Sequence, residues 1–168
     1  MTFDMVGEEA GYSRNLAFQK FGSKSALLEA VIDHLHDLAE RARHDAGLDR
    51  LDGLSAVQAF CDVQFSAHSD TQFMRAYSIL LGSAVSELSE TLLLFEREHK
   101  KIGGTLRQLF ERGLADGSIR KDVNARKASI VVGTQLLGIS VQSIVVNDFQ
   151  PEEALAEFKA AIRRAYGA

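Results

Sequence analysis

Apolar residues recur at intervals of three and four positions along most of the chain, whereas alternation of apolar and polar positions is scarce. Intervals of three and four place side chains on one face of a helix, and a half-buried strand would show an interval of two. The only proline, Pro151, stands where it can begin a helix rather than interrupt one. The pattern therefore predicts an all-α protein.

Capping residues and glycines divide this pattern into separate helices. The expected helices cover residues 3–10, 14–20, 24–46 and 55–67, a stretch after Asp70, then 86–115, 125–146 and a last helix from Pro151. Ser23 and Asn124 can accept hydrogen bonds from first-turn amides and are predicted N-caps. Gly22 and Gly47 can adopt the left-handed backbone that ends a helix. The long helix 86–115 contains glycines at 103–104, where we expect it to bend or loosen.

The stretch 2–21 is predicted to be a helix, a tight glycine turn and a second helix. This is the layout of a helix-turn-helix, in which the second helix enters the major groove of DNA. The outer face of that second helix would carry Arg14, Asn15, Gln19 and Lys20. Arginine can pair with guanine edges, and asparagine or glutamine with adenine edges. Any helical hairpin has the same layout, so a hairpin with a purely structural role remains an alternative when spacing alone is considered.

The sequence "TFDMVGEEAGYSRNLAFQKFGSKSALLEAV", residues 2–31, resembles the second half of the DNA-binding domain of TetR-family transcriptional regulators. The matching features are the opening threonine, the turn "AGYS", an aromatic residue near the end of the second helix, and "FGSK" followed by leucines. Further on, "RGLADGSIRKDVNARKAS" at 112–129 resembles the family's connection into its dimerisation helices. The resemblance implies an all-α fold with a partial helix-turn-helix domain and connecting helix at 1–46, and a ligand-binding and dimerisation domain at 47–168.

The same resemblance implies a function and a set of DNA-contacting residues. The function would be that of a DNA-binding regulator, a repressor released by a small-molecule ligand. The implied DNA-binding residues are Thr2, Ser13, Arg14, Asn15, Gln19, Lys20 and Lys24, with Thr2 and Lys24 on phosphates. Two positions depart from the family: Phe18 lacks the hydroxyl of the usual tyrosine, and Leu16 replaces a commonly polar residue.

The family has a further helix before the opening threonine, whereas Thr2 is the second residue here. Three interpretations stay open. The natural protein can begin further upstream, another segment can take the place of that helix, or the chain can be a shortened module. In the last case it would dimerise without binding DNA and titrate a homologous regulator into inactive pairs. Binding to double-stranded DNA is expected only if the first helix is present.

The body offers candidates for an effector pocket, because small-molecule sites mix apolar and polar side chains. These candidates are Phe60, Gln64, Tyr77, Phe95, His99 and Gln135. Ordinary core packing is the alternative explanation for each of them.

The stretch "IVVGTQLLGISVQSIVV", residues 130–146, is apolar nearly all round and must be covered on every side. A homodimer joined through the last two helices as a four-helix bundle would cover it, and burial within one chain is the alternative. Two recognition helices related by a twofold axis would read a palindromic operator.

Charge and motifs narrow the function further. The net charge is −4, yet Arg14, Lys20 and Lys24 are the only charged residues between Glu9 and Glu29, which makes a local basic window. The sequence has no glycine-rich phosphate loop, nucleophile elbow or HExxH motif, so we expect no enzyme and no cofactor.

The cysteine and histidines predict neither a disulfide nor a metal site. Cys61 is the only cysteine, which excludes an internal disulfide and suits the cytoplasm. His34 and His36 stand two positions apart on a helix and point to different sides, so they cannot readily share a metal. The apolar stretches are interrupted by polar residues, and we expect no membrane association.

Overall fold

The structure, a computed structural model, describes residues 14–67, 71–87 and 91–168, and the expected all-α fold is confirmed. The helices are α2 (Arg14–Phe21), α3 (Lys24–Asp45), α4 (Gly53–Ala67), α5 (Thr71–Glu87), α6 (Thr91–Asp116), α7 (Ala125–Val145) and α8 (Pro151–Tyr166), with a short 3-10 turn at Leu48–Arg50. The helix predicted over 3–10 lies outside the described residues.

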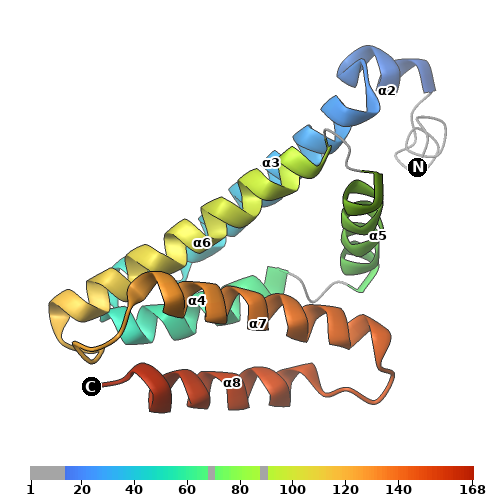
Figure 1. Ribbon diagram of the computed structural model, residues 1–168. Helices are drawn as coiled ribbons and strands as arrows, with labels where there is room; N and C mark the ends of the chain where they lie inside the picture. The colour runs from blue at the N-terminus through green and yellow to red at the C-terminus, as the bar shows by residue number, and fades with distance from the viewer. Residues whose placement is uncertain (1–13, 68–70, 88–90) are drawn as a thin grey trace.

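Two long helices, α3 and α6, run side by side along the molecule (Figure 1). At one end of this pair α3 carries α2, which packs against it. At the other end α6 packs against α4 and α7, and α8 covers both α4 and α7. The remaining helix, α5, contacts α6 and α7. The arrangement divides the described chain into a head, formed by α2 and the first turns of α3, and a helical body.

Most of the predicted helix ends are confirmed. The Ser23 side chain accepts a hydrogen bond from the Ala26 amide at 3.1 Å, and Asn124 accepts one from the Lys127 amide at 3.0 Å. Gly22 has φ 71° and Gly47 has φ 65°, so both take the left-handed backbone expected after a helix.

Two predicted boundaries are wrong. Residues 86–87 belong to α5, and α6 begins only at Thr91, because the apolar spacing continues across the break and does not mark it. The helix α4 begins at Gly53 rather than near Ser55, since its first amides find hydrogen-bond acceptors far away in the chain. Within α6, helical structure continues through Gly103 and Gly104 without a break.

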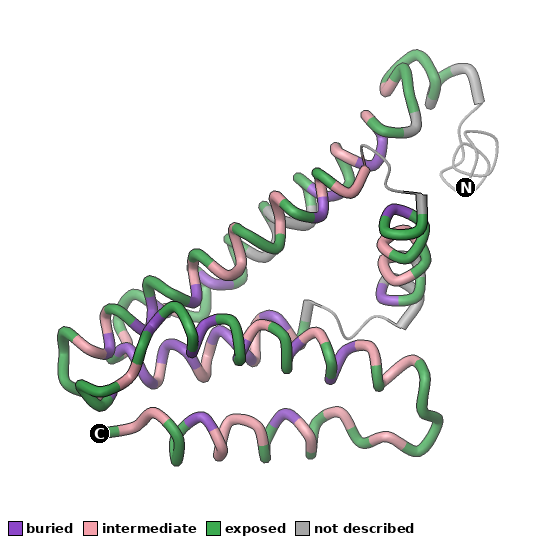
Figure 2. Tube along the Cα trace, viewed as in Figure 1, coloured by how far each residue is buried: buried purple, intermediate pink, exposed green. Residues whose placement is uncertain are grey.

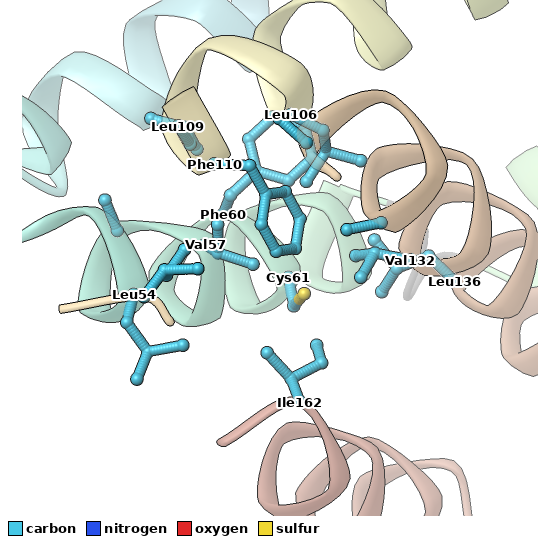
Figure 3. Packing of buried hydrophobic residues seen from close by; sticks show 14 of the residues in the cluster. Leu54, Val57, Phe60, Cys61, Leu106, Leu109, Phe110, Val132, Leu136 and Ile162 are labelled. Atoms are coloured by element: carbon cyan, nitrogen blue, oxygen red, sulfur yellow. The ribbon is translucent and has the colours of Figure 1, made fainter. Parts of the chain in front are cut away.

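The core lies where α4, α6, α7 and α8 meet (Figure 3). Phe60 from α4 and Phe110 from α6 are fully buried, and Val132 from α7 is buried beside them. Ile162 from α8 closes the other side, next to Cys61. Burial of each large apolar side chain contributes roughly 1.5–3 kcal/mol, so this cluster is the main source of stability in the body.

Remote side chains cap the start of α4. The Gly53 amide donates to Asp116 Oδ2 at 2.7 Å, and the Leu54 amide donates to Ser118 Oγ at 3.1 Å. At the same place the backbones of α4 and α6 nearly touch, because a Cβ on Gly53 would overlap the Gly113 backbone. The turn at 116–118, directly after α6, therefore fixes α4 against the end of α6.

Buried and exposed residues alternate along α7, so only one side of this helix is covered (Figure 2). Within the described residues, α7 is the single unbroken helix long and apolar enough to cross a membrane by length and composition. That is weak evidence, because a core helix of a globular protein passes the same test. Its inner side is buried, while Ile130, Val131 and Val145 are more than half exposed.

The Gly53–Gly113 crossing gives a prediction about stability. Gly53→Ala should lower the free energy of unfolding by about 1–3 kcal/mol, because the new methyl group must push α4 away from α6. The matched control is Gly104→Ala, where an added Cβ meets nothing within 4 Å and helix propensity should raise stability by about 0.5–1 kcal/mol. Urea denaturation measures both. Equal effects of the two substitutions would contradict the close crossing.

Candidate functional site

The predicted recognition helix is present as α2, at the far end of α3 from the body (Figure 1). Gln19 and Lys20 are exposed on it. Arg14 and Asn15 occupy its first turn, and Lys24 is the first residue of α3. Two of the predicted DNA-binding residues, Thr2 and Ser13, lie outside the described residues.

The surface of α2 is basic and partly apolar. Leu16 and Phe18 are 47% and 54% exposed, and the Lys20 ammonium lies 5.6 Å from the centre of the Phe21 ring. No acidic residue occurs in α2 or in the first turn of α3. A short basic helix of this kind can approach a phosphate backbone without like-charge repulsion.

An ion-pair cluster joins α3 to α6 close to the head. Arg97 of α6 donates from Nη1 to Glu29 Oε1 at 3.1 Å and from Nη2 to Asp33 Oδ1 at 2.9 Å, both on α3. The hydrogen bond to Glu29, together with the nearby carboxylates, raises the pKa of Arg97. The three side chains are about half exposed, so solvent screens both pairs and each contributes little to stability. The fork of one guanidinium nevertheless bridges the two helices, because it contacts two carboxylates of α3 at once.

A second arginine joins the other end of α3 to the body. Arg43 is only 6% exposed, lies 5.5 Å from the centre of the Phe60 ring, and donates to Gln64 Oε1 at 3.2 Å. Glu40 of α3 accepts a further hydrogen bond from it and balances its charge. Phe60 and Gln64, two of the predicted pocket residues, therefore contribute to the contact between α3 and α4.

Three other predicted pocket residues meet between α5 and α6. The Tyr77 hydroxyl and His99 Nε2 share a hydrogen bond of 2.6 Å, and the Tyr77 ring packs edge-on against Phe95 with 5.3 Å between ring centres. Burial, with a smaller effect from Glu98, raises the pKa of Tyr77 to about 12. Burial of part of the His99 ring lowers its pKa. The cluster is therefore uncharged near neutral pH, polar at one point and otherwise apolar.

Next to this cluster, the buried hydroxyl of Ser78 has no hydrogen-bond partner within the described part of the chain. Leaving a buried hydroxyl unpaired costs free energy. A bound molecule that forms a hydrogen bond with Ser78 Oγ would remove this cost. We define the α5–α6 cluster as Tyr77, Ser78, Phe95 and His99. The sixth predicted pocket residue, Gln135, is exposed on α7.

Sequence patterns missed three residues that matter here. Arg43 occupies a buried position of α3, whereas the apolar side chain of Val31 on the same helix is 42% exposed. Arg97 belongs to a run of charges that reads as ordinary surface, and nothing in the sequence distinguishes Ser78 from other serines. Only the pairing of helices distant in sequence reveals these roles.

The described residues contain no group of three or more His, Cys, Asp or Glu side chains that could hold a metal ion. Cys61 is fully buried in the core, and burial raises the pKa of its thiol to about 12. A protonated, enclosed thiol is a packing residue rather than a nucleophile.

Comparison with solved structures identifies the fold. A TetR transcription regulator from Haloarcula marismortui superposes with a TM-score of 0.85 at 17% identity, covering 100% of this chain and 88% of that one. The protein SmeT, in its complex with triclosan, gives 0.80 at 18% identity, covering 100% and 82%. The fatty acid degradation regulator FadR from Bacillus halodurans gives 0.81 at 12% identity, covering 96% and 83%. The protein has the fold of TetR-family transcriptional regulators.

No family model matches the sequence, and no curated protein shows a significant match to it. The likeness is therefore one of fold, at identities too low to carry residue roles across.

His99 gives a prediction about pH dependence. Its pKa is lower in the folded state than in the unfolded chain, so the unfolded chain binds the proton more readily as the pH falls. Stability should therefore decrease between about pH 7.5 and pH 5.5, and His99→Gln should make this decrease smaller. The midpoint of urea unfolding at each pH measures the effect. His44→Gln, at an exposed histidine of α3, is the control; an equal change in both variants would contradict the role of His99.

Proposed function

We propose that the protein is a cytoplasmic, DNA-binding transcriptional regulator, a repressor that a small-molecule effector releases from DNA, and not an enzyme. The observation that carries the proposal is an exposed, basic α2 at the end of a helix that is tied to the body at both ends. The TetR-family fold supports it, since two of the similar proteins named above, those from Haloarcula marismortui and Bacillus halodurans, are regulators. In this proposal residues 1–46 form the DNA-binding part and residues 47–168 form the ligand-binding and dimerisation part.

The DNA-binding residues in this proposal are Thr2, Ser13, Arg14, Asn15, Gln19, Lys20 and Lys24. Gln19, exposed on α2, would contact a base edge, where a glutamine amide suits adenine. Lys20, exposed beside it, would contact a phosphate. A homodimer through α7 and α8 would present two copies of α2 to the two halves of a palindromic operator.

The effector site in this proposal is the α5–α6 cluster. Its phenol ring packs against the buried Phe95 ring and shares a hydrogen bond with the His99 imidazole. Ser78, the next residue after Tyr77, adds a buried hydroxyl without a partner among the described residues. Such a site suits an uncharged, mainly apolar molecule that carries one or two hydrogen-bonding groups. The solved structure of the similar protein SmeT is that of its complex with triclosan. Phe60, Gln64 and Gln135 lie elsewhere and are not needed for this site.

The effector signal would pass through α6. His99 in the cluster stands two residues from Arg97, which holds α3 through Glu29 and Asp33. A shift or rotation of α6 when the effector binds would therefore move α3, while Arg43 keeps its far end attached to α4. A helix fixed at one end and displaced near the other changes the angle of the head.

Selection from a pool of random DNA duplexes tests the DNA-binding function. The natural gene product should enrich an inverted repeat and bind it less tightly as salt rises. Gln19→Ala should weaken binding to the selected site by about 5–150-fold and relax the preference at one base pair of each half-site, as expected for loss of a base contact. Lys20→Ala should instead weaken binding to all sequences alike and reduce the salt dependence.

The control variant is Lys100→Ala, which removes an exposed lysine that pairs with Glu96 and belongs to α6 rather than α2. It should leave the selected sequence and its affinity unchanged. A gene product that dimerises and enriches no sequence would contradict the regulator and favour the alternative, a module that pairs with a homologous regulator. A compound that releases the selected DNA should lose potency against Ser78→Ala if the α5–α6 cluster binds it.

Hydrogen exchange tests the path from α6 to the head. Arg97→Ala removes both ion pairs to α3, so amides in the first half of α3 should exchange roughly 2–10-fold faster. Arg107→Ala on the same helix removes one pair, to Glu111, and should leave α3 unchanged. Mass spectrometry of peptides covering residues 24–35 measures the rates. Unchanged exchange of α3 in Arg97→Ala would show that the head is held without this cluster.

A further inference from the structure

The helix α6 consists of two halves that contact different parts of the molecule (Figure 1). Its first half, residues 91–102, lies toward the head, where Arg97 binds two carboxylates of α3 and His99 shares a hydrogen bond with α5. Its second half, residues 105–116, belongs to the body, where Phe110 is fully buried in the core. A single helix therefore connects the polar contacts with α3 to the apolar core.

The second half of α6 is held closely in the body. A Cβ on Gly113 would overlap the Ile119 side chain, and a Cβ on Gly53 of α4 would overlap the Gly113 backbone. Leu106 and Phe110 are both fully buried. A movement of this half would break contacts that stabilise the whole body, because a closely packed interior does not deform continuously.

Gly103 and Gly104 separate the two halves. A Cβ built on either glycine meets no atom of another element within 4 Å, so no close contact in the described chain requires glycine at these positions. Glycine destabilises a helix interior relative to alanine, because it has more backbone freedom to lose on folding. Helix propensity is therefore low at the boundary between the two halves, where packing does not account for the choice of residue.

The backbone around the two glycines can bend at little cost in hydrogen bonds. Thr105 Oγ1 donates to the Lys101 carbonyl oxygen at 3.2 Å. This carbonyl therefore keeps a partner when its helical bond from the Thr105 amide lengthens, and hydroxyl contacts of this type often accompany bends in helices. Gly104 is exposed, so water can reach the backbone on that side of α6.

We propose that Gly103 and Gly104 form a hinge in α6, about which residues 91–102 tilt as one unit while residues 105–116 stay in the core. In the structure the hinge is straight, since helical structure continues through both glycines. Ile102, next to the pivot, moves least, which agrees with its position at the edge of the core cluster. A hinge consists of a few residues that absorb the change in backbone angles, and two adjacent glycines are suited to this.

The hinge specifies how the regulator would respond to its effector, and this role rests on the proposed function. The tilting unit contains His99 of the α5–α6 cluster and Arg97, whose two ion pairs hold α3. A molecule bound at the cluster would tilt the first half of α6 and move α3 with it. A shift of α6 as a rigid rod would instead disturb the buried contacts of Phe110, so the hinge is the less costly route.

Distances between spin labels test the hinge in the absence of an effector. One labelled pair, Glu96→Cys with Lys127→Cys, joins the first half of α6 to the start of α7. A second pair, Gln108→Cys with Lys127→Cys, joins the second half to the same point. All three positions are exposed, whereas the native Cys61 is fully buried and stays unlabelled.

Double electron–electron resonance measures the two distance distributions, with labelled chains diluted in unlabelled protein so that each assembly holds one labelled chain. The distribution for the pair 96 and 127 should be wider than that for the pair 108 and 127, because only the first pair spans the hinge. Equal widths overturn the proposal.

Alanine at both glycines removes the hinge. Gly103→Ala combined with Gly104→Ala should narrow the distribution for 96 and 127 to the width of that for 108 and 127, because alanine restricts the backbone and favours the helix. The control is Gly82→Ala, at an exposed glycine of α5 that also has no neighbour within 4 Å, and it should leave both distributions unchanged. A double variant with unchanged circular dichroism that keeps the wide distribution overturns the hinge.

DNA binding tests the role of the hinge in regulation. The selected duplex should narrow the distribution for 96 and 127 in the protein that retains both glycines, because one tilt of the first half gives the head the orientation that fits DNA. A scrambled duplex should leave the distribution wide. A protein that binds the selected duplex and keeps the wide distribution overturns this role.

The outcomes separate the hinge from the proposed function. Equal widths in a protein that enriches an operator overturn the hinge and leave the regulator in place. A wide distribution that the two alanines narrow, in a protein that enriches no DNA sequence, supports the hinge and overturns the regulator.

Discussion

The position of α3 is the constraint on which the rest of the structure depends. The head contributes little packing of its own, since among the described elements α2 packs against α3. Its placement relative to the body therefore follows from how α3 is attached. Besides the buried Leu27, Leu28 and Ile32, two arginines contribute to that attachment in different ways. Arg43 is buried and stacked against the core, whereas Arg97 is about half exposed and held by two carboxylates. A buried contact that is costly to break acts as the fixed end, and an exposed ionic contact can be exchanged at small cost.

The contacts of α3 with the core of the body and its contacts near the head therefore lie in different parts of the helix. The body is stabilised by the apolar cluster around Phe60 and Phe110, which is remote from the head (Figure 3). The contacts near the head are a smaller set: the partly solvated ion pairs of Arg97, and the buried side chains of Leu27, Leu28 and Ile32. A protein arranged in this way can change the orientation of α2 while the core stays intact, because the two sets of contacts share few residues.

Sequence patterns predicted the all-α fold, most helix boundaries and the caps at Ser23 and Asn124, because these features depend on residues close together in the chain. They failed where a distant segment decides the outcome. The start of α4 depends on an acceptor in Asp116, sixty-three positions away. Five of the six predicted pocket residues separated into two clusters and Gln135 joined neither, because sequence shows which helix face is apolar and not which helix lies against it. Tyr77 and His99 met across α5 and α6, whereas Gln64 turned toward Arg43. The continuous apolar character of α7 predicted burial on all sides, and one chain covers only part of it.

The single cysteine has a practical consequence. Cys61 is enclosed between α4 and α8, and its thiol is held in the protonated form. A thiol reagent can therefore reach it only when these helices separate. The rate of labelling then measures how often the core opens. Because Cys61 is enclosed, a cysteine introduced on the surface would react much faster than Cys61. Spectroscopic probes can therefore be attached to the head without replacing the native cysteine.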